Sequence, residues 1–448
     1  MTALTALLIL IVVMVVGVPI PLSFLASAAY ICFVNGTEHL MLFTYGFRVQ
    51  NTILLLTIPL FVMAGAVIDK GGIGEKLIEG LERFSKGSKT ALGTVTIVAC
   101  AIFGAVSGSA SATTSCIGSI MTPRLKENGY SAGHIGALLA SSGVLGIMIP
   151  PSILMILYAW GTGTSVLACF LATIVPGIIL IVLFSLVNAW LVKHEDPESP
   201  EARAALDQML VDAQRKEAEK KLAKAEREKR KGGTSAIPAV LMPVFLLGGI
   251  YGGVFTTTEG AAFSVLYSLL IGIFYYRKID FPTFRKTLSQ SGETAGTIMV
   301  MLFMVSILSR LYMTENLPDI ILDTLTSISS NRIVLLLMIN LFMIIIGMLM
   351  DDCSGTTLCG PILMPVMAAL GVTPVQFAAI LSVNIGMGNV TPPTAPLLYL
   401  GGRVAGAQVK DMLKPTFILI AFAWLPTLIL TTFCSPLSLF LPKLLGYV

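Results

Sequence analysis

Long apolar runs separated by short polar segments dominate this chain. A helix needs about 20 mostly apolar residues to cross a lipid bilayer, and runs of that order recur along the whole sequence. The pattern predicts membrane helices over residues 3–33 (interrupted at Gly17–Pro19), 52–69, 164–192, 236–256, 258–276, 291–309 and 416–434. Residues 73–85 and 316–327 instead place apolar side chains at helical spacing beside charged ones, which is typical of amphipathic helices at the membrane surface.

Two segments, 89–123 and 331–365, are too long and too interrupted for a single span. In the first, apolar runs of about 15 residues, shorter than a span requires, flank the polar sequence SGSAS at 107–111. We expect each segment to form a re-entrant helical hairpin with backbone polar groups exposed at its tip. Such exposure at membrane depth is tolerated only where the tip faces protein or a water-filled cavity.

The segments that follow, 134–158 and 374–400, are predicted to be helices that break near their middles. The first is interrupted between Gly146 and Pro151, and the second contains Pro392-Pro393. Because proline has no backbone N–H, carbonyl groups one turn before each pair lose their helical partners.

The hairpin and the broken helix occur twice. Residues 107–152 align with residues 349–394 without a gap, at a separation of 242 positions. The alignment pairs Gly118 with Gly360, Pro123 with Pro365, Gly129 with Gly371, Gly146 with Gly388, and Pro150-Pro151 with Pro392-Pro393. Glycine and proline determine backbone geometry, so a backbone shape is repeated. Matching Gly/Pro interruptions in two halves of an apolar chain indicate a secondary transporter with its site between the repeats.

Composition agrees with a membrane protein. Of the 448 residues, 55% are hydrophobic and 12% are charged, and the mean hydropathy is +0.86, whereas soluble domains carry about 25% charged residues. The net charge of +4 needs no nucleic-acid partner, because Lys and Arg lie between apolar runs. The sequence shows no metal-ligand spacing, nucleophile motif or phosphate-binding loop. We therefore expect an all-α polytopic membrane protein with inverted repeats, and not an enzyme.

Basic residues predict the orientation in the membrane. The first amphipathic segment and the exit of the first hairpin are rich in Lys and Arg, whereas the exit of the second hairpin, 366–373, is uncharged. The first hairpin should therefore open to the cytoplasm and the second to the outside, so that the repeats are inverted as alternating access requires. Alternation of the spans then places the N-terminus inside and the C-terminus outside. The highly charged stretch 195–231 predicts a solvated cytoplasmic insertion without chemistry of its own.

These elements predict a division of the chain into seven parts. They are a first-repeat scaffold and arm helix (1–88), the first half of a transport domain (89–158), a membrane helix (159–194), a charged cytoplasmic insertion (195–233), second-repeat scaffold helices with their arm helix (234–330), the second half of the transport domain (331–400) and a final membrane helix (401–448).

A broken helix beside a hairpin tip offers oxygen atoms to a hard cation such as Na⁺. The donors are Ser107, Ser109, Ser111 and the carbonyls near Gly146 and Ile149 in the first repeat, and Thr356, Thr391, Thr394 and the carbonyls near Gly347 and Gly388 in the second. A single Ser or Thr in a membrane helix often serves packing alone, but clustering around two equivalent breaks favours binding. We expect Gly146 and Gly388 to require the absence of a side chain, and valine at Gly143, outside the pairing, to have a milder effect.

Charged residues in apolar surroundings are the other candidates. Asp351 and Asp352 follow the apolar run IIIGMLM, and a carboxylate at membrane depth is costly and indicates function. The alternative is a boundary residue that caps the hairpin. Glu259, at a predicted helix start, fits a cap as well as a functional role. Arg310 could pair with either carboxylate or extend toward the interface.

Four stretches, in this order, resemble one family: FGAVSGSASATTSCIGSIMTP, GVLGIMIPPSILMILYAWGTGTSV, GGVFTTTEGAAFSVLYSLLIGIF and VNIGMGNVTPPTAPLLYL. They are similar to the large membrane (M) subunit of TRAP transporters, which are tripartite secondary transporters that depend on a periplasmic binding protein. The resemblance covers the chain apart from 195–231.

The resemblance implies an elevator-type carrier that couples uptake to Na⁺ and moves carboxylate substrates such as sialic acids or C4-dicarboxylates. It implies a small membrane (Q) subunit as a separate chain, a periplasmic substrate-binding (P) protein, the lipid bilayer of a bacterial or archaeal inner membrane, and no organic cofactor. The family's Na⁺ sites correspond here to Gly104, Ser107, Gly146 and Ile149 in one repeat and to Gly347, Gly388, Thr391 and Thr394 in the other. Further candidates for substrate contact or transport are Ser109, Ser111, Asp351, Thr356, Asn384, Pro150, Pro151, Pro392 and Pro393.

The chain departs from the family at a few positions. Thr257 stands where a proline is usual, and Asn389 stands where an apolar residue is usual. Only Asp351 matches the family's acidic position, so Asp351→Asn is expected to impair transport more than Asp352→Asn. Two alternatives are open: a stand-alone Na⁺/dicarboxylate symporter with the same inverted repeats, which would not depend on a binding protein, and a non-transporting membrane scaffold.

Overall fold

A computed structural model describes residues 2–37, 39–82, 88–194 and 235–447, and within these ranges the chain forms helices and turns and no strand. The predicted insertion lies outside the described residues. The helices before it are α1 (Thr2–Val15), α2 (Ile20–Asn35), α3 (His39–Gln50), the 3-10 turn η1 (Ile53–Leu56), α4 (Thr57–Lys70), α5 (Ile73–Glu82), α6 (Lys89–Ser107), α7 (Ala110–Glu127), α8 (Ala132–Gly143), α9 (Leu145–Met148), α10 (Ile153–Thr162) and α11 (Val166–Lys193).

The helices after the insertion follow the same numbering. They are α13 (Ile237–Tyr251), α14 (Thr257–Leu270) continued by the π-helical η2 (Ile271–Tyr275), α15 (Phe281–Thr314), α16 (Leu317–Ile328), α17 (Arg332–Leu349), α18 (Asp352–Ala369), α19 (Pro374–Gly388), α20 (Pro396–Ala405), α21 (Val409–Leu419) continued by the π-helical η3 (Ile420–Trp424), α22 (Leu425–Phe433) and α23 (Ser435–Leu444).

Both predicted hairpins and both broken helices are present. Hairpin one consists of α6 and α7, and hairpin two of α17 and α18; broken helix one consists of α8, α9 and α10, and broken helix two of α19 and α20. Broken helix one bends by 47° between Met148 and Ile153. Among the described residues, seven helices are long and apolar enough to cross a membrane, or eight if this bent pair counts as one.

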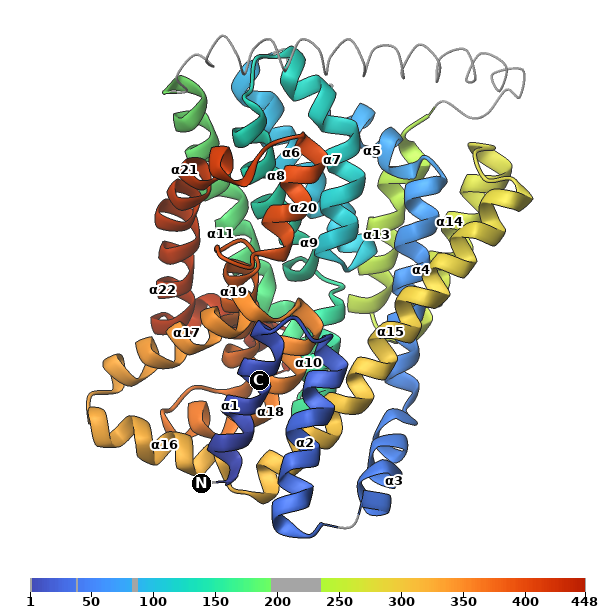
Figure 1. Ribbon diagram of the computed structural model, residues 1–448. Helices are drawn as coiled ribbons and strands as arrows, with labels where there is room; N and C mark the ends of the chain where they lie inside the picture. Colours follow the sequence, from blue (N-terminus) through green and yellow to red (C-terminus); the bar gives the residue numbers. More distant parts are fainter. Residues whose placement is uncertain (1, 38, 83–87, 195–234, 448) are drawn as a thin grey trace.

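The two repeats are inverted relative to each other. Hairpin one opens at the upper end of Figure 1 and hairpin two at the lower end, and their tips meet near the middle. The second half of each broken helix packs against the hairpin of the other repeat, α10 against α18 and α20 against α7.

Equivalent glycines of the two hairpins lie where each hairpin packs against the broken helix of the other repeat. A Cβ added to Gly118 would lie 2.7 Å from Val404 Cγ1, and one added to Gly360 would lie 3.7 Å from Thr162 Cγ2. Gly118 and Gly360 are paired by the repeat, and so are Thr162 and Val404. The same pair of positions therefore forms both interfaces, as an approximate two-fold axis between the repeats requires.

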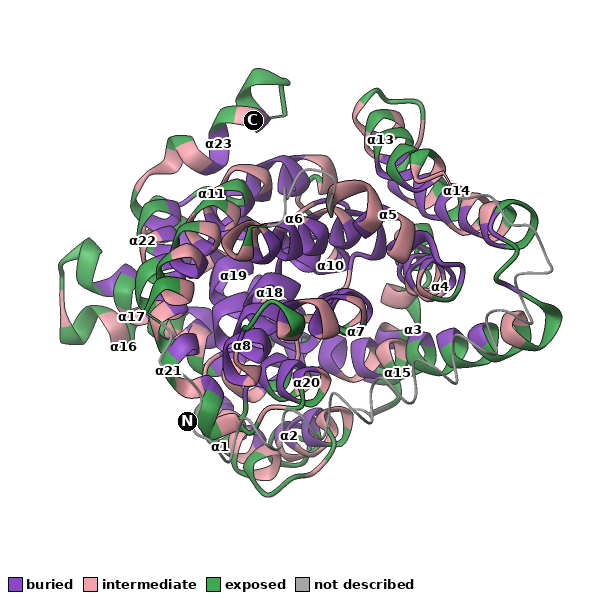
Figure 2. Ribbon diagram, turned by 90° about the horizontal axis from the view of Figure 1, so that it is seen from above, coloured by how far each residue is buried: buried purple, intermediate pink, exposed green. Residues whose placement is uncertain are grey.

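Burial divides the helices into an inner and an outer group. Seen from above, α6, α8, α10, α18 and α19 form the buried centre, and α13, α14, α16 and α23 lie at the rim (Figure 2). Exposed apolar side chains on the outer helices, such as Phe245 on α13 and Phe274 on η2, are what a surface in contact with lipid tails requires.

The structure corrects the predicted ends of several helices. α15 begins ten residues before the predicted 291, because Asp280 caps it by accepting a hydrogen bond from Thr283 N (2.9 Å) and Pro282 lies in its first turn. α3 was not predicted; it forms where Phe43 and Phe47 pack on Phe303 of α15, with ring centroids 6.0 and 5.0 Å away. α23 was also not predicted, and its Leu439 packs on α11 and α19.

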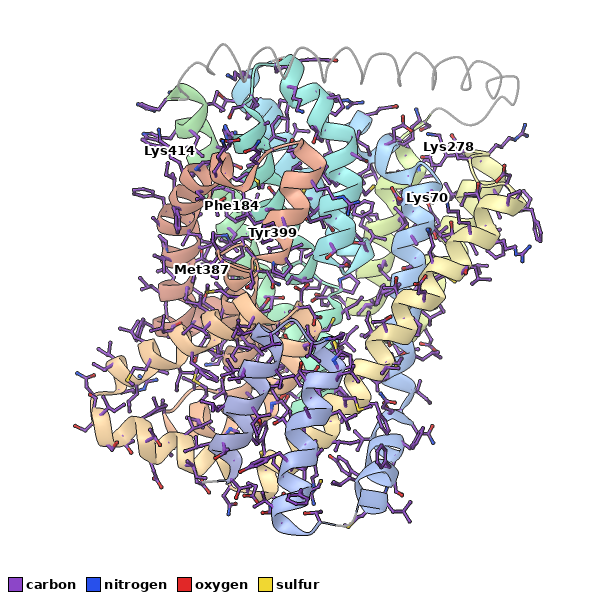
Figure 3. All side chains as sticks on the ribbon, in the orientation of Figure 1. Lys70, Phe184, Lys278, Met387, Tyr399 and Lys414 are labelled. Atoms are coloured by element: carbon purple, nitrogen blue, oxygen red, sulfur yellow. The ribbon has the colours of Figure 1, made fainter. Side chains whose placement is uncertain are left out.

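The expected position of the N-terminus is wrong. α1 and α2 pack against each other as an antiparallel pair, so the chain starts at the end of the molecule opposite the opening of hairpin one (Figure 1). The predicted charge difference between the two ends is present. Lys278 and Lys414 lie toward the end where hairpin one opens (Figure 3), and α16, which carries Asp319 and Asp323, lies at the other end.

Candidate transport site

The two hairpin tips are built in the same way with different residues. α6 ends at Ser107, Gly108 turns the chain with φ of 62°, and the Ser109 side chain caps α7 by accepting from Ala112 N (3.3 Å). In hairpin two, Met350 follows α17, and the Asp351 side chain caps α18 by accepting from Cys353 N (3.1 Å) and Ser354 N (3.4 Å). Ser109 and Asp351 are 242 positions apart. Asp351 therefore occupies the capping position that the sequence analysis left as the alternative to a functional role.

Each hairpin meets its broken helix through two glycines. A Cβ added to Gly104 would lie 2.2 Å from Gly146 Cα, and one added to Gly146 would lie 2.8 Å from the Ser109 carbonyl oxygen. In the second repeat, a Cβ added to Gly388 would lie 2.6 Å from the carbonyl carbon of Gly347. These distances leave no room for a side chain, so all four predicted glycines lie where the backbones of hairpin and broken helix touch.

The glycine pairs refine the repeat and correct one expectation. Gly104 and Gly347 are separated by 243 positions, so the first helices of the hairpins are offset by one residue from the rest, and Gly108 is the additional tip residue. Valine at Gly143 was expected to have a milder effect, and the structure does not support this: a Cβ there would lie 1.9 Å from Thr114 Oγ1, closer than at Gly146 or Gly388. The close packing of broken helix one against α7 therefore begins at Gly143, about one helical turn before Gly146.

The proline pairs lie at the two breaks. Proline at 150 and at 392 supplies no N–H to the carbonyls of Gly146 and Gly388, and the carbonyl of Gly388 accepts from Thr391 N instead, at 3.0 Å. Hydroxyl groups bond to other carbonyls beside the breaks: Ser152 Oγ donates to Ile147 O, and Thr394 Oγ1 donates to Met348 O. Thr391 Oγ1 donates to Met387 O at 2.6 Å. Each break therefore brings backbone and hydroxyl oxygens together within one helical turn.

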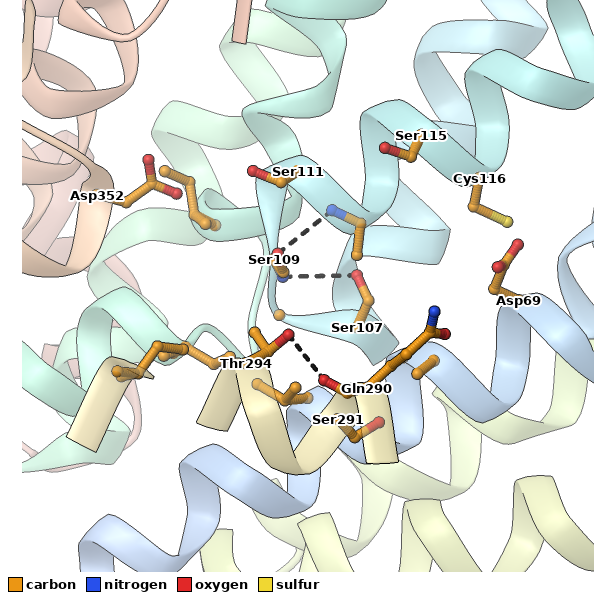
Figure 4. Close-up of a pocket in the computed structure, with 18 of the residues that line it drawn as sticks. Asp69, Ser107, Ser109, Ser111, Ser115, Cys116, Gln290, Ser291, Thr294 and Asp352 are labelled. Carbon is orange, nitrogen blue, oxygen red and sulfur yellow. Dashed lines mark hydrogen bonds between the residues drawn. The ribbon is translucent and has the colours of Figure 1, made fainter. Parts of the chain in front are cut away.

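A cavity of about 530 Å³ lies beside the tip of hairpin one (Figure 4). Its lining comes from α4, hairpin one, broken helix one, α15 and the start of α18, and it includes the predicted Ser107, Ser109 and Ser111. Ser115 and Ser119 continue the lining along α7 away from the tip, so the cavity extends toward the end where hairpin one opens. Ile149, Thr356, Thr391, Thr394, Asn384 and the four prolines are not among the lining residues.

Several lining residues were not predicted. Ser115 and Ser119 follow the predicted Ser111 at intervals of four residues, which places all three on one face of α7. This spacing is visible in the sequence, so the two additional serines could have been found. Gln290 and Thr294 line the opposite wall from α15; Gln290 lies just before the predicted start of this helix at 291, and Thr294 lies within the predicted span. Asp69 and Lys70 reach the cavity from the end of α4 and form an ion pair at 2.7 Å.

Asp352, and not Asp351, lines the cavity (Figure 4). Asn389 Nδ2 donates a hydrogen bond to Asp352 Oδ1, which connects the first residue of α18 to the break in broken helix two. Since asparagine caps a helix about as well as aspartate, this geometry favours the reverse of the expected order, with Asp352→Asn impairing transport more than Asp351→Asn.

Three other polar residues have structural partners. Asn384 is buried away from the cavity, where its Nδ2 donates to Asn340 Oδ1 at 2.8 Å. Glu259 caps α14, since its carboxylate accepts from Thr256 N (2.8 Å) while Thr256 Oγ1 accepts from Glu259 N (3.2 Å). Arg310 lies over the ring of Tyr45, 5.7 Å from its centroid.

Comparison with known proteins identifies the family. The family model described as Tripartite ATP-independent periplasmic transporter, DctM component, matches residues 7–437. The chain is 30% identical over 404 residues to the C4-dicarboxylate TRAP transporter large permease protein DctM of Pseudomonas aeruginosa, covering 89% of this chain and 88% of that protein. It is 29% identical to the sialic acid TRAP transporter large permease protein SiaM of Vibrio cholerae, covering 88% of this chain and 87% of that protein.

Two further matches concern length and fold. The chain is 30% identical to the isethionate TRAP transporter permease protein DctMQ of Oleidesulfovibrio alaskensis over 95% of its own length, and spans 64% of that protein. Among solved structures, the Alcanivorax borkumensis YdaH transporter has a similar fold, with a TM-score of 0.51, 13% identity and 88% coverage of both chains. The chain therefore belongs to the DctM family of TRAP transporter large permease subunits, which are multi-pass proteins of the bacterial inner membrane that transport and do not catalyse a reaction.

Proposed function

We propose that this protein carries organic acids into the cell together with Na⁺, by alternating access of the inner helices relative to the outer ones. A periplasmic substrate-binding protein delivers the substrate, and a small membrane subunit completes the complex. Two of the relatives reported above are named for C4-dicarboxylate and sialic acid, and a third is named for isethionate, a sulfonate. The proposed substrate is therefore a small organic anion, and a carboxylate in the first place.

One observation carries the proposal: the cavity offers a carboxylate no free positive charge. Lys70 is the one basic side chain among the described residues that line it, and Lys70 is already paired with Asp69. An anion entering a partly buried site needs a compensating charge. Cations that bind beside the cavity and move with the substrate supply that charge.

The residues at the two breaks fit Na⁺. Hard cations bind oxygen, and helix breaks at membrane depth offer carbonyl oxygens to coupling ions. In the first repeat the oxygens come from Ser107 and from the carbonyls of Gly104, Gly146 and Ile149; in the second they come from Thr391, Thr394 and the carbonyls of Gly347 and Gly388. The close glycine contacts bring hairpin and broken helix near enough to share one ion in each repeat. Bound Na⁺ supplies positive charge next to the cavity.

The position of the cavity supports alternating access. It runs from the tip of hairpin one along α7 toward the end where that hairpin opens. In the inverted arrangement, the equivalent path along α18 leads to the opposite end. Movement of the hairpins and broken helices as one body past α4 and α15 exchanges one opening for the other.

Uptake into proteoliposomes tests the proposal. The chain is reconstituted with its small membrane subunit, and the binding protein is added outside with a radiolabelled organic acid. We expect uptake only with an inward Na⁺ gradient and only with the binding protein. Equal uptake with K⁺ or with a proton gradient in place of Na⁺ would show that the coupling is wrong, and uptake without the binding protein would favour a stand-alone symporter.

A further inference from the structure

Asp352 and Asn389 form a polar pair that spans the second repeat. Asn389 Nδ2 donates to Asp352 Oδ1. Asp352 faces the cavity, whereas Asn389 is completely buried. The pair therefore lies between the cavity and the break in broken helix two.

The first repeat has no such pair. The positions 242 residues earlier are Ala110, the first residue of α7, and Ile147, in α9, and both are buried and apolar. Since the first repeat builds the same hairpin tip and the same break with apolar residues there, the backbone does not need the polar pair. The polar pair is therefore better explained by a ligand that it binds than by the fold.

The charge of Asp352 is poorly compensated. Within the part of the chain that the structure describes, neither Asp351 nor Asp352 has a basic side chain within ion-pair distance. Asp351 accepts from two backbone N–H groups and from Ser354 Oγ, while the side chain of Asp352 accepts from one neutral amide. A carboxylate at membrane depth with one neutral partner is costly, and it repels an anion in the same cavity.

Among the described residues, two further oxygen atoms around Asp352 lack a hydrogen-bond partner. Asn389 Oδ1 is buried and has no partner in the described structure. Thr356 Oγ1 is also buried and has no partner, and it lies one helical turn beyond Asp352 on the same face of α18. A proton on Asp352 and the hydroxyl hydrogen of Thr356 can each satisfy a single acceptor. A metal cation contacts several oxygens at once, and carboxylate, amide and hydroxyl oxygens are the ligands that hard cations prefer.

We propose that Asp352, Asn389 and Thr356 form a side-chain Na⁺ site in the second repeat, separate from the two positions proposed at the breaks. The site rests on the proposed function, because an anionic substrate must share the cavity with Asp352. A cation held there neutralises the carboxylate and provides positive charge beside the substrate. The second repeat thus binds one more Na⁺ than the first.

The double variant Asp352→Ala/Asn389→Ile tests this site. It gives the second repeat the same residue types, alanine and isoleucine, that the first repeat has at the equivalent positions 110 and 147. The measurement is equilibrium dialysis of the purified complex against radioactive Na⁺ without substrate, which counts the ions bound per chain. We expect the variant to lose one Na⁺ relative to the unaltered protein, and its uptake to depend less steeply on Na⁺ concentration. Asp351→Asn, which keeps the helix cap, is the matched control and should bind the full number.

Each other outcome contradicts the site in a recognisable way. If the double variant binds as many ions as the unaltered protein, the pair is a structural contact and the coupling by Na⁺ stands. If the unaltered protein binds no Na⁺, both this site and the proposed coupling are wrong. Asp352→Asn, which changes one atom, replaces the double variant if the latter does not insert stably, and the same loss of one ion is expected.

Discussion

The two repeats share a backbone and differ in the side chains at their tips. Both have a capped second hairpin helix, a glycine contact between hairpin and broken helix, and a proline pair at the break. At the tip of hairpin one the polar groups are the hydroxyls of Ser107, Ser109 and Ser111, whereas at the tip of hairpin two they are the carboxylates of Asp351 and Asp352. Most of the cavity lining comes from hairpin one and its neighbours, and α18 contributes Asp352 and Cys353.

This difference separates the requirements of shape from those of chemistry. Inverted repeats need the same backbone on both sides, because alternating access exchanges their roles. Hydroxyl groups suit a neutral wall that a polar substrate contacts, while carboxylates concentrate negative charge that attracts cations. Under the proposed function, the first repeat would provide most of the substrate surface, and the second would provide the charge that favours coupling ions.

The largest expected effect comes from side chains at the glycine contacts. A Cβ on Gly388 meets only backbone, with Gly347 C at 2.6 Å and Ile344 O at 2.7 Å, whereas a Cβ on Gly146 first meets the side-chain oxygen of Thr113 at 2.5 Å. Backbone must move in both cases, and such overpacking costs about 1–3 kcal/mol or more. Gly388→Val and Gly146→Val should each lower the initial rate of Na⁺-dependent uptake by roughly tenfold or more, Gly388→Val by the larger factor.

Gly248→Val is the control for these variants, because nothing lies within 4 Å of a Cβ added to Gly248 on α13. It should keep near-normal uptake at equal membrane levels. Normal rates and normal Na⁺ dependence in both paired variants would mean that the breaks are not the cation sites.

Thiol labelling compares the two tips directly. Ser111 and Cys353 are equivalent in the repeat, and both line the cavity. A membrane-impermeant thiol reagent should modify Cys353 and an introduced cysteine in Ser111→Cys, and saturating substrate should slow both reactions several-fold. Cys359, on the same helix as Cys353 but buried, should stay unmodified. Protection at one tip alone would show that the substrate contacts a single repeat.

Removal of the two caps should have a smaller effect, on stability. Loss of an N-cap costs about 1 kcal/mol, so Ser109→Ala and Asp351→Ala should each lower the thermal unfolding midpoint of the purified protein. Asp351→Ala should lower it further, because Asp351 bonds two backbone N–H groups and Ser109 one. Asp351→Asn should stay close to the unaltered protein. A large loss of stability in Asp351→Asn would show that the charge, and not the cap, is what the tip requires.

The smallest effect is expected for the segment that belongs to neither repeat. Replacing residues 195–231 by a short Gly/Ser linker should leave uptake within about twofold, because so highly charged a sequence has no part in the predicted site. Immunoblotting of membranes controls for expression. Loss of uptake at normal membrane levels would assign the insertion a function that its sequence does not indicate.

Agreement between sequence and structure follows the strength of the local signal. The breaks at Gly146–Pro151 and at Pro392-Pro393 were predicted correctly, because proline and glycine act on their own backbone whatever surrounds them. α3 escaped prediction because its sequence, HLMLFTYGFRVQ, is neither long nor periodic in apolar residues, and packing of Phe43 and Phe47 on α15 stabilises it. The start of α15 could have been found from Asp280 and Pro282, which are a cap and a first-turn proline.

The sequence by itself determined the all-helical membrane class, the duplicated hairpin and broken helix, and the glycines and prolines that shape them, since hydropathy and backbone restriction are properties of short stretches of chain. Only the tertiary structure decided which polar groups meet. It brought Gln290 and Thr294 of α15 opposite the serines of α7, paired Asp352 with Asn389, and made Asp351 a helix cap. These contacts join residues far apart in sequence or choose between adjacent ones, and that choice depends on how the helices pack.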